Sequence, residues 1–340
     1  MLNTMCRLIS PKLFEEVYAE EDIENKVIIR PTHLSICHAD QRYYQGKRSA
    51  QVLNEKLPMA LIHESIGVVV KDPTNTFDVG DLVTMIPNTP VESDDVILEN
   101  YMESSKFRSS GFDGFMGDYA ILPSDRVIKL PNNINPNVAA FTELVSVSVH
   151  AVNRFAEFSH ERRNVIGVWG DGNLGYITSL ILKIVFPDSK IFVFGRHMSK
   201  LGIFTFADGL FLTEEVPRDL RIDHAFECVG GEGSQDAINQ IIEIINPQGS
   251  ICLMGVSEHP VPIYTRDVLA KGLQFFGISR SGRDDFEKTV ELYEKYPKFL
   301  NYLEDIVGNV VEIKCLEDIY DAFDIDSNSQ LGKTILVWKK

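Results

Sequence analysis

The stretch VIGVWGDGNLGY (Val165–Tyr176) decides the fold of this chain. An apolar run leads into Gly170, and Gly172 and Gly175 follow it in the spacing G-x-G-x-x-G. The first glycine permits a tight turn, the second lets a pyrophosphate approach the backbone, and the third lets a helix pack closely on the strand. The stretch therefore predicts a strand–turn–helix unit that binds a dinucleotide. The predicted cofactor-binding residues in this loop are Gly170, Gly172, Asn173, Leu174 and Gly175.

The pattern of the chain changes near residue 145. Residues 1–145 contain short strand-like runs separated by Pro, Gly, Asn and Asp, which is typical of a β-rich domain. Residues 146–290 instead alternate apolar strands with helical segments, which indicates a parallel, doubly wound sheet. Residues 291–340 end in the strand-like GKTILVW, which we expect to return to the first domain. The predicted fold class is thus α/β, with a β-rich domain followed by a doubly wound one.

The end of the second strand, IFVFG (191–195), indicates which dinucleotide is bound. An enzyme that uses NAD normally places Asp or Glu there to hold the ribose 2′-hydroxyl. This chain has Gly195, followed by Arg196 and His197, and Lys200 lies one turn further on. The missing carboxylate and the added cations favour the 2′-phosphate of NADPH. The alternative is that these cations form an ordinary solvated surface.

Composition and charge exclude several classes of protein. The 340 residues are 44% hydrophobic and 24% charged, as in a soluble globular protein, and the formal net charge is −16. This charge argues against nucleic acid or an anionic membrane surface as a partner. The five cysteines form no CxxC pair, so we expect a reduced, cytoplasmic setting. The N-terminus does not resemble a signal peptide, and the longest apolar helical stretch carries Lys183, so no membrane span is expected.

Four residues outside the glycine motif have the chemistry of zinc ligands. They are Cys37, His63, Glu64 and Glu143. Zinc accepts thiolate, imidazole and carboxylate ligands, and a catalytic site keeps one position open for water or substrate. The four residues are scattered over the first domain, which suits an active site built from several loops rather than a structural finger. Taken singly, each is more typical of a packed core residue.

These motifs together resemble the zinc-dependent medium-chain dehydrogenase/reductase family, over nearly the whole chain. The matching motifs are C-x-x-D from Cys37 to Asp40, HE-x-x-G-x-V from His63, VGDLV from Val79 to Val83, the glycine motif, and ECVGG from Glu227 to Gly231. The resemblance implies a GroES-like catalytic domain over residues 1–145 and a Rossmann NADP-binding domain over 146–290. It also implies that residues 291–340 return to the catalytic domain.

Within that family, the chain looks most like the polyol dehydrogenase branch. There a Glu stands where alcohol dehydrogenases use Cys, and TELVSVSVHA places Glu143 at that position. The resemblance implies a zinc held by Cys37, His63 and Glu143, with Glu64 able to enter the ligand set. Many relatives carry a four-cysteine lobe for a second, structural zinc, but residues 87–113 contain no Cys. We therefore expect one catalytic zinc per subunit and no structural zinc.

The resemblance to this branch extends over the whole chain, and it implies an activity: reduction of D-ribulose 5-phosphate to D-ribitol 5-phosphate by NADPH. The product would supply CDP-ribitol for wall teichoic acid or capsule, and a ribitol-5-phosphate cytidylyltransferase is the implied partner. In this mechanism the metal polarises the C2 carbonyl and the nicotinamide C4 hydride attacks that carbon. Family members are dimers or tetramers, and LQFFGIS (273–279) is a plausible edge strand for a homodimer.

Basic residues near Cys37 are candidates for holding a substrate phosphate. Arg42, Lys47 and Arg48 follow it closely, and the alternative is an ordinary exposed basic loop. Weaker candidates are Arg280 and Arg283 in SRSGRDDF. Asp40 is expected to orient a group beside the metal, and its alternative role is a turn or capping carboxylate.

The proton route departs from the family pattern. Relatives place Ser or Thr two residues after the ligand Cys, but this chain has Ala39, and Arg42 stands where a relay His often lies. Glu64, a zinc-bound water and Tyr43 remain as alternatives. Two other functions also stay open from the sequence. One is an NAD-linked polyol dehydrogenase acting on a non-phosphorylated sugar alcohol, and the other is a non-catalytic redox sensor.

Overall fold

The computed structural model describes all of residues 1–340 and divides into two compact units. Unit 1 comprises residues 1–146 and 280–340, and unit 2 comprises residues 147–279. Unit 1 is therefore formed by two segments of the chain, one before and one after unit 2 in the sequence. No helix is both long and apolar enough to cross a membrane.

Unit 1 is built on a seven-stranded sheet with the order β10-β6-β5-β3-β18-β17, in which β9 also pairs with β3. The strands of this sheet are β3 (Val27–Ser35), β5 (Glu64–Lys71), β6 (Leu82–Met85), β9 (Ala120–Leu122), β10 (Val127–Lys129), β17 (Val307–Ile313) and β18 (Lys333–Trp338). A three-stranded sheet and a two-stranded sheet complete the unit: β1 (Leu2–Ser10), β2 (Leu13–Glu20) and β4 (Met59–Ala60), and β7 (Asn88–Thr89) with β8 (Lys106–Phe107).

Unit 1 also contains six α-helices and two 3-10 helices. They are α1 (His38–Tyr44), α2 (Ala50–Lys56), η1 (Glu99–Tyr101), η2 (Ser124–Arg126), α3 (Pro136–Ala139), α9 (Arg283–Lys295), α10 (Pro297–Glu304) and α11 (Leu316–Asn328). Helix α4 (Thr142–Phe158) starts in unit 1 and continues into unit 2. The side chains of Phe14, Tyr44 and Phe323 pack together in the core, with Tyr44 and Phe323 ring centroids 4.7 Å apart.

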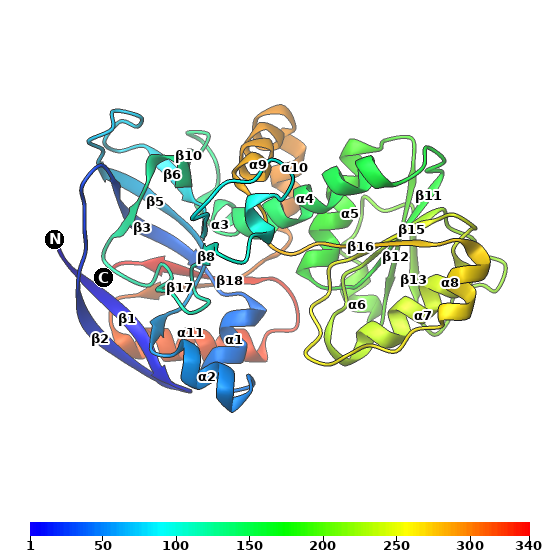
Figure 1. Ribbon diagram of the computed structural model, residues 1–340, viewed down its shortest axis with the longest axis horizontal. Helices are drawn as coiled ribbons and strands as arrows, with labels where there is room; N and C mark the ends of the chain where they lie inside the picture. Colours follow the sequence, from blue (N-terminus) through cyan, green and yellow to red (C-terminus); the bar gives the residue numbers. More distant parts are fainter. The chain divides into compact units, whose positions relative to one another are not determined.

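The last strand, β18, lies inside the unit 1 sheet. It runs antiparallel to β3, with Leu336 opposite Leu34, and parallel to β17. Figure 1 shows the red strand β18 between the dark blue β3 and the red β17. The C-terminal segment thus returns to the first sheet, and Lys333 at the start of β18 is brought to the end of β3.

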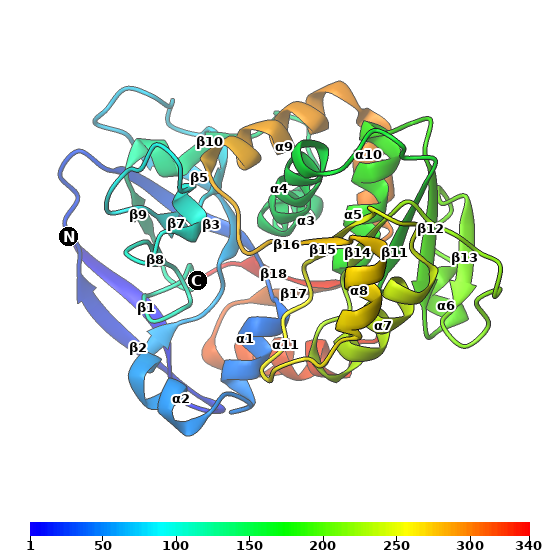
Figure 2. The ribbon, with the colours of Figure 1, turned by 45° about the vertical axis from the view of Figure 1, so that its right-hand side comes forward.

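Unit 2 is a six-stranded, all-parallel sheet with the order β13-β12-β11-β14-β15-β16. Its strands are β11 (Val165–Trp169), β12 (Lys190–Gly195), β13 (Gly209–Leu212), β14 (His224–Glu227), β15 (Ser250–Leu253) and β16 (Gln274–Gly277). Its helices, besides most of α4, are α5 (Asn173–Val185), α6 (Met198–Leu201), η3 (Gly231–Gly233), α7 (Ser234–Ile244) and α8 (Thr265–Lys271). Figure 2 shows α7 and α8 together in front of this sheet. The strands are apolar on both faces because helices cover both.

The predicted fold class is confirmed: a β-rich unit and a doubly wound parallel sheet. Strand β16 stands at one edge of that sheet, where the sequence places it.

Candidate active site

The four residues proposed as zinc ligands come together in unit 1. His63, Glu64 and Glu143 form one group, and Cys37 with Asp40 and His63 forms another; within each group the ligand atoms lie within 4.8 Å of one another. Cys37 caps the N-terminus of α1, the pair His63–Glu64 follows β4, and Glu143 lies in the first turn of α4. Three separate parts of the chain therefore supply the cluster, as the scattered positions predict.

Unsatisfied polar atoms show that this cluster fits a metal ion. His63 Nδ1 and Glu64 Oε2 are buried without a hydrogen-bond partner. Burial raises the pKa of Glu143 to about 7, and the Glu64 carboxylate acts in the same direction while His63 acts against it. Burial also raises the pKa of the Cys37 thiol, as do Asp40 and Glu64. A divalent cation would stabilise the ionised forms of Glu143 and Cys37, and thiolate, imidazole and carboxylate are the donors that zinc prefers.

Asp40 connects the two backbone segments that carry Cys37 and His63. Its Oδ2 accepts a hydrogen bond from Cys37 N at 3.1 Å, and its Oδ1 accepts from Ile62 N at 3.0 Å and Ser109 Oγ at 2.8 Å. The carboxylate is fully buried, and Ile62 has a φ of 69°, in the left-handed region. Asp40 thus caps α1 and also fixes the strained residue before His63, so the capping and orienting roles coincide in one side chain.

Lys333 is a member of the cluster that the sequence did not reveal. Its Nζ donates to Glu64 Oε1 at 2.8 Å and to Ile36 O at 2.7 Å. Burial alone would lower the pKa of Lys333, but Glu64 and Cys37 raise it above its ordinary value. The lysine therefore stays charged and occupies one oxygen of Glu64. No local motif signals this contact, because it depends on how β18 is placed beside β3.

Of the two weaker arginine candidates, only Arg280 lies near the metal cluster. Its guanidinium carbon is 4.4 Å from the centroid of the Phe107 ring, which in turn lies 5.3 Å from that of the His63 ring. Burial lowers the pKa of Arg280 and the nearby Glu143 carboxylate raises it. Arg283 is instead bonded to Asp125 O and Glu287. These contacts hold Arg283 at the start of α9.

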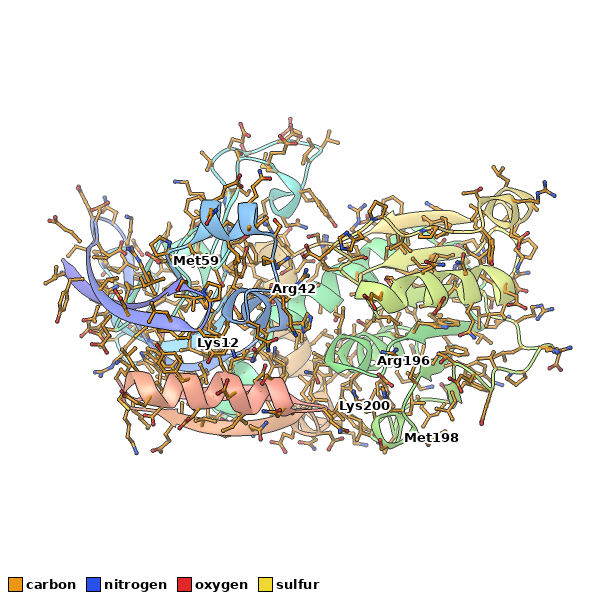
Figure 3. The ribbon with its side chains drawn as sticks, turned by 90° about the horizontal axis from the view of Figure 1, so that it is seen from below. Lys12, Arg42, Met59, Arg196, Met198 and Lys200 are labelled. Atoms are coloured by element: carbon orange, nitrogen blue, oxygen red, sulfur yellow. The ribbon has the colours of Figure 1, made fainter.

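The basic run beside Cys37 concentrates positive charge. Lys47 N donates to Arg42 O at 2.8 Å, and the Arg48 guanidinium lies 5.0 Å from the ring centroid of Tyr43. Burial lowers the pKa of Arg42, and Arg48 lowers it further. The pKa of His38, directly after Cys37, is lowered by burial and then by the cations of the run. Figure 3 places Arg42 on α1. The run is thus a local basic cluster in an acidic protein.

The glycine motif of unit 2 forms an open cradle at the start of α5. Gly170 has a φ of +133°, and a Cβ there would lie 3.0 Å from Cys228 O. A Cβ on Gly175 would lie 2.0 Å from Gly170 O, so only glycine lets α5 begin so close to β11. Gly172 has open space around its Cβ position and caps α5. The backbone is therefore free to receive a pyrophosphate at the helix N-terminus.

The predicted 2′-phosphate residues lie together after β12. Gly195 ends that strand, Arg196 and His197 form the turn, and Lys200 lies in α6. Figure 3 shows the labelled Arg196 and Lys200 on neighbouring segments of unit 2. The sequence did not point to Asp171, the residue between the first two glycines, whose Oδ2 accepts hydrogen bonds from Arg196 N and His197 N, each at 2.9 Å.

Two family models match the chain: the alcohol dehydrogenase GroES-like domain over residues 23–132 and the zinc-binding dehydrogenase domain over residues 212–295. With the relatives described next, these matches show that the chain belongs to the zinc-dependent medium-chain dehydrogenase/reductase family. The resemblance inferred from the motifs is confirmed.

The chain is 52% identical to the ribulose-5-phosphate reductase of Bacillus spizizenii over 340 residues, which cover 100% of both chains. It is 51% identical to ribulose-5-phosphate reductase 1 of Staphylococcus aureus over 99% of each chain. Among solved structures, S. aureus TarJ in complex with NADPH superposes with a TM-score of 0.90, at 46% identity over 100% of both chains.

Proposed function

We propose that this chain reduces D-ribulose 5-phosphate to D-ribitol 5-phosphate with NADPH and one catalytic zinc. The observation that carries the proposal is the full-length identity of 52% to a ribulose-5-phosphate reductase. Two features of the structure support it: the buried donor set around His63, and the basic run beside Cys37. The zinc domain in this proposal comprises residues 1–145 and 291–340, and the NADP-binding domain comprises 146–290; the compact units differ in that residues 280–290 belong to unit 1.

In the proposed site, Cys37, His63 and Glu143 hold the metal. A zinc ion bound there supplies Lewis-acid polarisation of the substrate carbonyl, and NADPH supplies the hydride. Asp40 keeps the Cys37 and His63 segments in place through its three hydrogen bonds. Glu64 presents its unpartnered Oε2 to the cluster while Lys333 holds Oε1. Glu64 is thus placed to enter the ligand set or to accept a proton.

The basic run is proposed to hold the substrate phosphate. Beyond the effect of burial, Arg48 lowers the pKa of Arg42, and all three cations lower the pKa of the neighbouring His38, so the run is suited to attract an anion. Their position directly after the ligand Cys37 suits a phosphate a few carbons away from the reacting carbonyl. A phosphate carries the negative charge that this cluster of cations attracts and a non-phosphorylated sugar alcohol does not, which favours the sugar phosphate.

The proposal includes no structural zinc, because residues 87–113 contain no Cys. Hydrogen bonds to Glu99 stabilise part of this segment. Glu99 in η1 is held by Arg126, whose Nη1 donates to Glu99 Oε1 at 2.8 Å, and by the backbone N of Arg283, which donates to the same oxygen at 2.9 Å. Asn88 Nδ2 also donates to Glu99 O at 3.1 Å. Hydrogen bonds to the carboxylate and to the backbone carbonyl of Glu99 thus hold part of this segment.

The assembly and partners are part of the same proposal. The edge strand β16 supports a homodimer, with a tetramer as the alternative, because an unpaired strand edge can pair with a second copy. The product would feed a ribitol-5-phosphate cytidylyltransferase and, through CDP-ribitol, wall teichoic acid or capsule.

The test is a comparison of initial rates with D-ribulose 5-phosphate and free D-ribulose, each with NADPH and NADH, before and after chelation. We expect the highest kcat/KM for the pair of phosphorylated sugar and NADPH, with about one zinc per chain and loss of activity on chelation. If NADH outperforms NADPH, or free ribulose matches its 5-phosphate, the NAD-linked polyol dehydrogenase takes its place.

A further inference from the structure

Asp171 occupies the space that a cofactor-reading carboxylate at the end of β12 would need. A Cβ added to Gly195 would lie 2.6 Å from Asp171 Cβ and 3.0 Å from Asp171 Oδ2. Real Cβ atoms do not approach a neighbouring carbon so closely, so a side chain at position 195 would force the backbone at Gly195 or Asp171 to shift. The chain therefore has its acidic side chain in the glycine loop rather than at the end of the strand.

The Asp171 carboxylate is directed into the protein's own backbone. Its Oδ2 accepts from Arg196 N and His197 N, both at 2.9 Å, and lies 3.0 Å from His197 Nδ1. The Asp171 side chain is 17% exposed, against 51% for His197. One oxygen thus fixes two consecutive peptide groups and one side chain of the turn that follows β12.

The surroundings of Asp171 offset its negative charge. Burial alone would raise the pKa of Asp171, but the hydrogen bonds from His197 and Arg196, together with the charge of Lys200, lower it below its ordinary value. The carboxylate is therefore ionised, and it is compensated by amide dipoles and nearby cations. An uncompensated carboxylate here would repel a phosphate. The Asp171 carboxylate instead holds the backbone of the turn that carries Arg196 and His197.

We propose that Asp171 is the positioning residue for the 2′-phosphate of NADPH: it holds the Arg196–His197 turn so that Arg196 and Lys200 face the phosphate. It also excludes an acidic side chain at position 195, which would select NAD. This inference rests on the proposed use of NADPH and assigns its specificity to a residue outside the glycine positions and the basic turn.

The first test measures dissociation constants of NADPH and NADH by fluorescence, without sugar phosphate, for the wild type, Asp171→Ala and Asp171→Asn. We expect Asp171→Ala to weaken NADPH binding roughly tenfold and NADH binding much less, because two backbone N–H groups lose a charged acceptor. Asp171→Asn keeps an acceptor oxygen and should restore part of the affinity. Equal losses for both cofactors, or tighter NADPH binding, would overturn the proposal, the latter by showing that Asp171 contacts the ribose.

A matched control is Asp208→Ala. Asp208 Oδ2 accepts from Ile191 N and Lys183 Nζ, each at 2.8 Å, near the opposite end of β12 from Gly195. It resembles Asp171 in its bonds but is remote from the turn. The variant should keep the wild-type ratio of the two dissociation constants; a ratio shifted as in Asp171→Ala would mean that any loosening of β12 changes cofactor choice, against the proposal.

The second test addresses the steric part with Gly195→Asp alone and combined with Asp171→Gly. The single variant should bind both cofactors poorly or lose solubility, whereas the double variant should fold and prefer NADH. If Gly195→Asp alone yields a stable NADH-preferring protein, the exclusion is refuted. A wild type that prefers NADH would refute the proposed function instead, so the two failures are distinguishable.

Discussion

The Lys333 Nζ atom donates a hydrogen bond to Glu64 Oε1 at 2.8 Å, and the two side chains are only 4% and 1% exposed. The pair joins β18 to the start of β5, beside the proposed zinc ligands. A buried ion pair contributes little compared with a well-packed apolar pair, but removing one partner leaves a charge that nothing compensates. The negative charge of Glu64 is therefore compensated by Lys333, which lies 269 positions further along the chain.

Replacing Lys333 with Met should lower the free energy of unfolding of the metal-free protein by about 3–5 kcal/mol. The loss arises because Glu64 remains buried without its cation. Urea unfolding of the metal-free chain measures it. The double variant Lys333→Met/Glu64→Leu should recover most of the loss, and Lys26→Ala, which removes an exposed ion pair with Asp22, should change little. An equal cost for the single and double variants would contradict this account.

Replacing Cys37 with Ser should reduce bound zinc from about one ion per chain to a small fraction and abolish reduction of the sugar phosphate, because the thiolate ligand is lost. NADPH binding should persist, since the glycine cradle lies in unit 2. Elemental analysis and fluorescence titration measure the two effects. Cys315→Ser, at an exposed cysteine, is the control and should retain its zinc. Full zinc content in Cys37→Ser would remove this residue from the ligand set.

Replacing Arg196 with Asp should reduce the ratio of kcat/KM for NADPH to that for NADH by roughly tenfold or more. The change removes a cation from the proposed 2′-phosphate site and adds a repelling charge. Arg218→Asp makes the same charge change at an exposed position of unit 2 and should leave the ratio unaltered. If both variants shift the ratio alike, the effect comes from net charge and not from the site.

Replacing Arg42 with Ala should raise the KM for D-ribulose 5-phosphate roughly tenfold, because a charge-assisted contact to the phosphate is lost. The KM for free D-ribulose should change much less. The control is Lys71→Ala, at the opposite end of β5 from Glu64. Equal increases in KM for the two sugars would indicate a general disturbance of α1 instead of phosphate recognition.

Acidification should destabilise unit 2 through His224, which is fully buried in β14. Burial, with His160 nearby, lowers the pKa of His224 from 6.5 to about 4. Its Nδ1 accepts from Ser250 N at 3.1 Å, so a proton there would break that bond. The neutral ring therefore contributes fully above pH 6.5, and up to about 3 kcal/mol is lost as the pH falls through 4.

The measurement is urea unfolding of the wild type and of His224→Gln between pH 7 and 4. The variant does not titrate at this position, so its stability should decline less steeply with acidification. Parallel curves for the two proteins would show that other groups govern the acid sensitivity.

Local patterns in the sequence predicted much of the fold. The glycine motif identified β11, the tight turn and the start of α5, because the positive φ of Gly170 and the close approach of Gly175 to Gly170 O require glycine. The alternation of apolar runs with helices was sufficient to predict the parallel sheet. The candidate ligands were predicted from donor chemistry and from the resemblance to the family, and the structure brings those residues together.

The supporting contacts could not be inferred, because they depend on register and on backbone dihedral angles. Lys333 reaches Glu64 only because β18 pairs with β3. Arg280 adopts a φ of 61°, and its guanidinium lies over Phe107, which no spacing rule indicates. Asp171 occupies a variable position of the glycine motif, so the motif does not predict its hydrogen bonds to the turn after β12.

The division of unit 1 around unit 2 has a consequence for synthesis on the ribosome. Cys37, His63, Glu64 and Glu143 all emerge before unit 2 is made, but Lys333 emerges after it. Unit 2 is continuous and can fold while the sheet of unit 1 still lacks β17 and β18. The nascent donor set thus meets the metals of its surroundings before the counter-charge of Glu64 arrives. We therefore expect the order of synthesis, as well as affinity, to influence which metal occupies the proposed site.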